Sequence, residues 1–154
     1  ADAMATLIRL PSAQRGGAKR VLGPDLRRAS AVPVISIVEE TAASVLETGA
    51  RKVVLLATPT TIDEGLYDSA LEGVEVVRPR EQGRVTALIL DALRGRKDPS
   101  ALRAVVDGER GRADAVVLGC TDLSLLAEGW KEPQLVDSLK VLASVVVSRS
   151  RVAR

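Results

Sequence analysis

Two apolar runs stand out in the chain, Lys52-Val53-Val54-Leu55-Leu56-Ala57 and, later, Asp114-Ala115-Val116-Val117-Leu118-Gly119. Each run is rich in β-branched and aliphatic residues, which is the pattern of a β-strand that is buried on both faces. Thr58-Pro59-Thr60-Thr61 follows the first run directly, and Cys120-Thr121-Asp122 follows the second. In parallel sheets, ligands bind beyond the carboxyl ends of the strands, so we expect a functional site at these two segments.

Segments with helical spacing separate the predicted strands. The clearest helix has apolar residues at i, i+3, i+4, i+7 and i+8 before Gly95, namely Val85, Leu88, Ile89, Ala92 and Leu93. Asp98-Pro99 is typical of the N-cap and first residue of the next helix. The remaining pattern predicts strands at 32–37, 74–78 and 135–136, and helices at 38–49, 61–73 (from the capping box Thr61-Ile62-Asp63-Glu64), 123–127 and from about 138.

This alternation of strands and helices predicts an α/β fold, with a parallel sheet, helices on both of its faces and right-handed crossovers. Residues 1–30 do not share the pattern. Their segment Pro11–Arg20 has the composition of a loop, and Gly23-Pro24 is a turn signal.

The composition excludes several classes of function. With one Cys and no His in 154 residues, the chain can form no Ser-His-Asp triad, no Cys-His pair, no internal disulfide and no thiolate-rich zinc site. The net charge is only +2, and Tyr67 and Trp130 are the only aromatic residues, which argues against a nucleic-acid partner. Because no apolar run approaches the ~18 residues of a membrane span, and no signal peptide is evident, we expect a cytoplasmic protein with no membrane partner.

Cys120 is the main candidate for chemistry. At the end of a strand and the start of a helix, helix amides would lower its pKa from about 8.5 and favour a thiolate, which is a base or a nucleophile. Thr121 and the Thr58–Thr61 loop would add hydroxyls that suit a small carboxylate. Structural interpretations stay open: a lone Cys often fills a core, and a Thr-rich turn often only caps a helix. Tyr67 is expected to be packed, with no role in the site.

The segment Leu118-Gly119-Cys120-Thr121-Asp122-Leu123-Ser124-Leu125-Leu126 resembles the second cysteine motif of the aspartate/glutamate racemase superfamily. Residues 34–42, 55–61 and 136–138 are similar to three further segments of that family, in the same order. The resemblance implies a cofactor-independent racemase of aspartate or glutamate, with two α/β domains that each supply one thiol to opposite faces of Cα. It implies Cys120 as the catalytic residue and Thr121, Thr58 and Thr61 as substrate-binding residues. No metal, pyridoxal phosphate or nucleotide is implied.

The family's first motif, Cys-Asn-Thr followed shortly by His, is absent from this sequence. We therefore expect a truncated chain in which residues 1–37 are a remnant of the first domain, partly disordered at 9–24. Residues 38–137 would be the second racemase-like domain, and residues 138–154 a C-terminal helix. Apolar surface left exposed on the remnant predicts a homo-oligomer, a dimer.

The expected ligand is a small amino acid or dicarboxylate. Two other interpretations remain beside the racemase. Without the first cysteine, the chain could be a catalytically inactive racemase-like module that binds a ligand or serves a structural role. It could also be a relative of the hydantoin racemases or maleate isomerases, which share the arrangement with two cysteines.

Overall fold

The computed structural model describes residues 28–31 and 34–152. The chain divides into two units between Val34 and Ile35, and the second unit, residues 35–154, contains every strand and helix considered below. The disorder expected at 9–24 lies outside the described residues, as do Val32 and Pro33 of the strand expected at 32–37.

A parallel four-stranded sheet forms the centre of this unit, in the order β2-β1-β3-β4. The strands are β1 (Lys52–Leu56), β2 (Glu75–Val77), β3 (Ala115–Leu118) and β4 (Leu135–Asp137). The two central strands, β1 and β3, arise from the two apolar runs, and apart from Lys52 all their residues are buried. The predicted α/β class with a parallel sheet is therefore confirmed.

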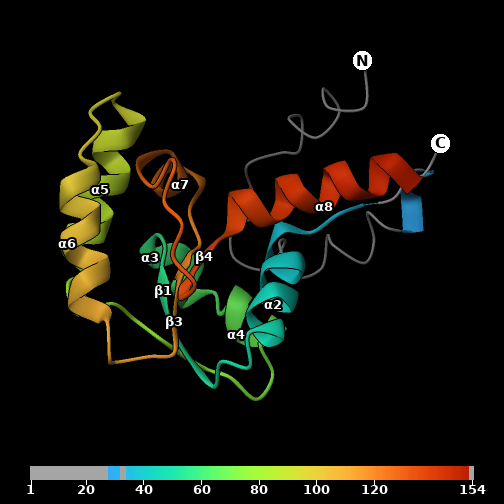
Figure 1. Ribbon diagram of the computed structural model, residues 1–154, viewed down its shortest axis with the longest axis horizontal. Coiled ribbons are helices and arrows are strands. Elements are labelled where there is room, and N and C mark those ends of the chain that lie inside the picture. Colours follow the sequence, from blue (N-terminus) through green and yellow to red (C-terminus); the bar gives the residue numbers. More distant parts are fainter. Residues whose placement is uncertain (1–27, 32–33, 153–154) are drawn as a thin grey trace. The chain divides into compact units, whose positions relative to one another are not determined.

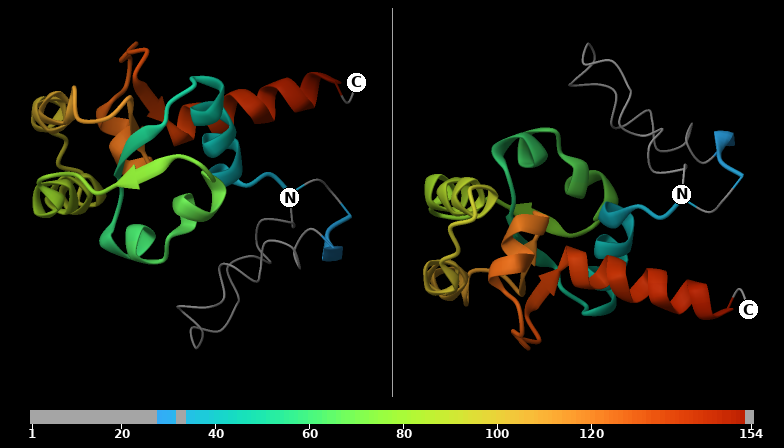
Figure 2. Two further views of the ribbon diagram at one scale, coloured as in Figure 1. Left: turned by 90° about the horizontal axis from the view of Figure 1, so that it is seen from below. Right: turned by 90° about the horizontal axis from the view of Figure 1, so that it is seen from above.

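Helices cover both faces of the sheet (Figures 1 and 2). One face carries α2 (Ile37–Glu47), α4 (Leu66–Ala70) and α8 (Ser138–Val152), and the other carries α5 (Gln82–Leu93), α6 (Pro99–Glu109) and α7 (Thr121–Leu126). The short helix α3 (Pro59–Asp63) follows β1 and packs with the first group through Ile62.

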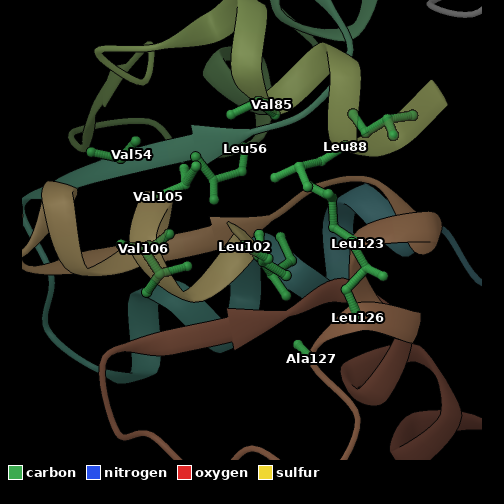
Figure 3. Close-up of a cluster of buried hydrophobic side chains, with 13 residues drawn as sticks. Val54, Leu56, Val85, Leu88, Leu102, Val105, Val106, Leu123, Leu126 and Ala127 are labelled. Carbon is green, nitrogen blue, oxygen red and sulfur yellow. The ribbon is translucent and has the colours of Figure 1, made fainter. Parts of the chain in front are cut away.

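The two faces have separate hydrophobic cores because successive side chains of a strand point to opposite sides. From β1, Val54 and Leu56 enter the core under α5, α6 and α7, whereas Val53 and Leu55 enter the core under α2 and α4. Figure 3 shows the first core, in which side chains from the three helices point toward the sheet. These cores position the strand ends that carry the candidate site.

Several predicted boundaries are confirmed. The side chain of Asp98 caps α6 by accepting a hydrogen bond from the Ala101 amide at 2.9 Å. Gly95, with φ +77°, follows the end of α5. The strands expected at 74–78 and 135–136 are β2 and β4, and the last two expected helices are α7 and α8. In the part of the chain that the structure describes, no helix is long and apolar enough to cross a membrane.

Two predicted elements are wrong. Residues 34–36 are not in a strand, because Ser36 serves as the N-cap of α2 and accepts a hydrogen bond from the Glu39 amide at 3.4 Å. The predicted capping box at 61–64 is not used, since Thr58 caps α3 and Pro59 occupies the first helical position. The helix expected over 61–73 is also divided, because Gly65 takes a left-handed conformation, φ +59°, between α3 and α4.

Candidate active site

The carboxyl ends of β1 and β3 meet at one edge of the sheet. Leu56 pairs with Leu118 in the strand register, and the Gly119 amide donates a hydrogen bond to the Leu56 carbonyl at 2.9 Å. This last bond extends the pairing by one residue, so Thr58 and Cys120 leave the sheet from neighbouring strands. The tertiary structure thus brings together the two segments that the sequence singled out.

Cys120 is the N-cap residue of α7, with an extended backbone, and its free thiol is half-buried. The Sγ–H donates to Oδ2 of Asp122 at 3.5 Å, a distance within reach of a sulfur hydrogen bond. Asp122 belongs to the segment Cys120-Thr121-Asp122 that the sequence singled out, but no role was predicted for it. Its position two residues after the cysteine was the available signal.

The expected low pKa of Cys120 is wrong. Burial raises the pKa of the thiol, and hydrogen bonds from the backbone amides of Asp122 and Leu123 only partly oppose this effect. The Asp122 carboxylate raises the pKa further, because its negative charge disfavours a thiolate and because it accepts the thiol hydrogen. The group is thus held as a thiol, and its conjugate thiolate, when formed, is a stronger base than an ordinary cysteine thiolate.

Thr58 and Thr61 form one hydroxyl pair at the start of α3. Their Oγ1 atoms lie 3.0 Å apart, and Thr58 Oγ1 also accepts a hydrogen bond from the Thr61 amide at 3.3 Å. A hydrogen bond between two hydroxyls uses one of their two protons, so the other is available to a carboxylate. Thr121, the first residue of α7, is exposed beside Cys120. The substrate-binding roles of these three residues stay predictions.

Asp137 connects this edge of the sheet to α7. It pairs with Leu118 in the register of β4, and its buried carboxylate accepts hydrogen bonds from Ser124 Oγ at 2.6 Å and from the Leu139 and Lys140 amides at 3.1 and 3.2 Å. The same carboxylate therefore caps α8 and holds α7. Because Cys120 is the N-cap of α7, this link helps to hold the thiol in place.

Two surface depressions lie elsewhere. They flank β4, have volumes of about 220 and 290 Å³, and share Glu132, Pro133 and Leu135, but neither is lined by Cys120 or Thr58. Among residues 28–31 and 34–152, no group of three or more acidic, Cys or His side chains is arranged to hold a metal ion. The strand ends that carry Cys120 and the threonine pair remain the candidate site.

Comparison with solved structures supports the fold. The fold is similar to that of an aspartate racemase from Picrophilus torridus, at 24% identity and a TM-score of 0.62, over 75% of this chain and 52% of the other. It is also similar to an aspartate racemase homologue from Pyrococcus horikoshii OT3, at 27% identity and a TM-score of 0.69, over 87% of this chain and 63% of the other. The chain thus spans less than two thirds of the length of either protein.

A family model provides the assignment. The Asp/Glu/hydantoin racemase model matches residues 20–146, which include β1, the threonine pair, β3, Cys120 and β4. The matched residues make up most of the chain, which shows that it belongs to the family. The fold is also similar to those of the two racemase structures described above. This chain belongs to the Asp/Glu/hydantoin racemase family.

Proposed function

We propose that this chain transfers a proton at the Cα of an acidic amino acid, aspartate or glutamate, with Cys120 as the acid/base on one face of the substrate. The observation that carries the proposal is the half-buried thiol at the carboxyl end of β3, the strand that pairs with β1, which the threonine pair follows. Family membership and the aspartate racemase names of the two solved structures support the choice of substrate.

In the proposed reaction, the Cys120 thiol first loses its proton to solvent, and the thiolate then removes the Cα proton, so an S–H bond forms as the C–H bond breaks. The electron pair of the C–H bond is delocalised into the substrate carboxylate. A hydroxyl proton from Thr58 or Thr61, and the hydroxyl of Thr121, would stabilise the charge that develops on the carboxylate oxygens. Burial makes the thiolate a strong base, which suits the removal of a weakly acidic proton.

Inversion also needs a proton donor on the opposite face of Cα. These 154 residues contain no second cysteine and no histidine, so within them a side chain of another type would have to supply that donor. A single cysteine can still act alone: its thiolate removes the proton, the resulting thiol exchanges that proton with solvent, and a solvent hydrogen returns to the same face. Hydrogen exchange without inversion is therefore the minimal activity of the proposed site.

The test is proton NMR of L- and D-aspartate and L- and D-glutamate in deuterated buffer, with the wild-type chain, Cys120→Ala and Cys120→Ser. We expect the Cα signal to disappear with wild type and to persist with both variants. Appearance of the opposite enantiomer would identify a second acid/base group, whereas exchange alone would identify a site that works on one face.

The single cysteine also favours a second candidate, a racemase-like module that binds a dicarboxylate without catalysis. This candidate predicts no exchange with any of the four amino acids, together with saturable binding of aspartate or succinate. Isothermal titration calorimetry measures that binding directly. If neither exchange nor binding occurs, hydantoins and maleate, the substrates of related two-cysteine enzymes, are the next compounds to assay.

A further inference from the structure

The residue that follows β1, Ala57, is fully buried, and its carbonyl lies beyond the paired part of the sheet. The preceding carbonyl, that of Leu56, accepts a hydrogen bond from the Gly119 amide on the side of β3. Because successive carbonyls of a strand face opposite neighbours, the Ala57 carbonyl faces the side of β2. However, β2 ends at Val77, which lies opposite Val54 in the register. The Ala57 carbonyl therefore needs a donor from elsewhere.

The side chain of Gln82, the first residue of α5, supplies this donor. Its Nε2 donates hydrogen bonds to the Ala57 carbonyl at 3.0 Å and to Thr86 Oγ1 at 3.3 Å. The Thr86 hydroxyl donates its own proton to the Gln82 carbonyl at 3.0 Å, so its oxygen is free to accept. Both protons of Nε2 are thus used. A reversed amide would set Oε1 against the Ala57 carbonyl, which fixes the orientation of the group.

The segment that this hydrogen bond supports is α3, which carries the threonine pair. This helix has five residues and none of them is buried, so it is too short to be stable by itself. At its far end, Asp63 forms an ion pair with Arg78, but both side chains are exposed, and such pairs contribute little. A hydrogen bond to a buried carbonyl contributes more, because its loss leaves that carbonyl without a partner.

We propose that Gln82 is a positioning residue for the threonine pair: by donating to the Ala57 carbonyl, its amide fixes the peptide group that leads into Thr58, and with it the hydroxyls of Thr58 and Thr61. The proposal deepens the proton-transfer function and rests on it for the effect on substrate binding. Its structural consequence, a fixed threonine pair, does not depend on any substrate.

The first test is proton–nitrogen NMR of the wild-type chain. The sequence has three glutamines and no asparagine, so only three side-chain NH2 groups give signals, and sequential assignment identifies that of Gln82. We expect its protons to exchange with solvent at least roughly 10-fold more slowly than those of a free glutamine, because both are hydrogen-bonded. Exchange at the rate of a free glutamine would overturn the proposal, and this result needs no variant.

The second test is Gln82→Met, which keeps the length of the side chain and removes the donor. The Thr61 amide donates to Thr58 Oγ1 and so reports on the threonine pair. Its hydrogen exchange should become roughly 10-fold faster, the effect of losing one buried hydrogen bond. In the assay with aspartate, KM should rise about 10-fold with kcat little changed, because Cys120 follows a different strand. Unchanged exchange at Thr61, or a lower kcat with an unchanged KM, would overturn the proposal.

Val85→Ala is the matched control. Val85 belongs to the same helix and is fully buried, but it makes none of the hydrogen bonds of the Gln82 amide. The variant should lower the free energy of unfolding and leave both the exchange of the Thr61 amide and the KM at their wild-type values. Equal changes in Val85→Ala and Gln82→Met would overturn the proposal, since they would reflect a general loss of stability.

The failure of this proposal is distinguishable from the failure of the proposed function. If the wild-type chain acts on no amino acid but the Thr61 amide exchanges faster in Gln82→Met, the positioning role stands and the proton-transfer function does not. If the wild-type chain is active and Gln82→Met changes neither the Thr61 amide nor the KM, the function stands and the positioning role does not.

Discussion

The carboxylate of Asp122 lies 3.5 Å from the thiol of Cys120 and raises its pKa both by charge and by accepting its hydrogen. We predict that Asp122→Asn lowers the pKa of Cys120, because the neutral amide removes the charge and can donate a hydrogen bond to a thiolate. The backbone amide of residue 122, which lowers the pKa, remains in the variant. The midpoint of iodoacetamide alkylation against pH should move to lower values.

Asp114→Asn is the control for that measurement. Asp114 stands at the opposite end of β3, where its carboxylate accepts hydrogen bonds from the Arg51 and Lys52 amides at 2.8 and 2.9 Å. Asp114→Asn removes the same charge, but at the end of β3 away from the thiol. The pH midpoint of alkylation should therefore stay at the wild-type value. A midpoint in Asp122→Asn that stays constant or rises would contradict the role assigned to Asp122.

At the scale of the single element, residues that are neighbours in the sequence determine where α6 begins. Asp98 accepts a hydrogen bond from the Ala101 amide, and Pro99 occupies the first helical position, as the sequence predicted. We predict that Asp98→Ala lowers the free energy of unfolding by about 1 kcal/mol, the usual effect of removing an N-cap side chain. Urea unfolding followed by circular dichroism measures the difference.

Lys97→Ala is the matched control, since Lys97 is exposed and lies just before the cap. Its effect on the free energy of unfolding should stay within about 0.5 kcal/mol, as for most surface substitutions. If the two variants unfolded at the same urea concentration, the side chain of Asp98 would contribute nothing to α6.

The two wrong predictions arose where neighbouring residues favour different structures. Ser36 follows a β-branched segment that favours a strand, but its hydroxyl can also cap a helix, and the structure uses the cap. Thr58 and Thr61 are both possible N-caps, and Pro59 favours the earlier start because its fixed φ suits the first helical position. Sequence pattern alone does not rank such alternatives, because their energies differ by little.

At the scale of the whole molecule, burial holds the protons of Cys120 and Tyr67 more tightly in the folded state, since both pKa values are raised. The stability that these groups contribute is fully present below their unfolded pKa values, about 8.5 and 10. It is lost as the pH rises through the folded values. We predict that the free energy of unfolding falls as the pH rises above about 8.5.

Urea unfolding at a series of pH values tests this prediction, with Tyr67→Phe as the control because it lacks the ionisable phenol. As the pH rises above about 10, the ordinary pKa of a tyrosine, the free energy of unfolding should fall less in the variant than in the wild type. Equal losses in the two proteins would mean that Tyr67 does not contribute to the alkaline transition.

We also predict that the chain forms a dimer. Large apolar side chains remain exposed among the described residues, and in a monomer they would face water. These side chains are Leu46, Leu90, Leu93, Leu125, Val146 and Val147. Multi-angle light scattering should give twice the chain mass of 16.3 kDa, and the mass of a single chain at every concentration would contradict the prediction.

Most of the elements and their order could be predicted from the sequence, because strand burial, helical stripes and the cap at Asp98 are properties of residues close together in the chain. The strand at 32–37 and the undivided helix at 61–73 are the exceptions. The sequence also pointed to Cys120 and to the Thr58–Thr61 loop. The strand order, the hydrogen bond between the Gly119 amide and the Leu56 carbonyl, and the lack of space for a side chain at Gly119 depend on residues far apart in the chain, so only the three-dimensional structure shows them. It also reversed the expected pKa shift of Cys120, because desolvation depends on every residue packed around the thiol, whereas the favourable helix amides are the only contribution visible in the local sequence.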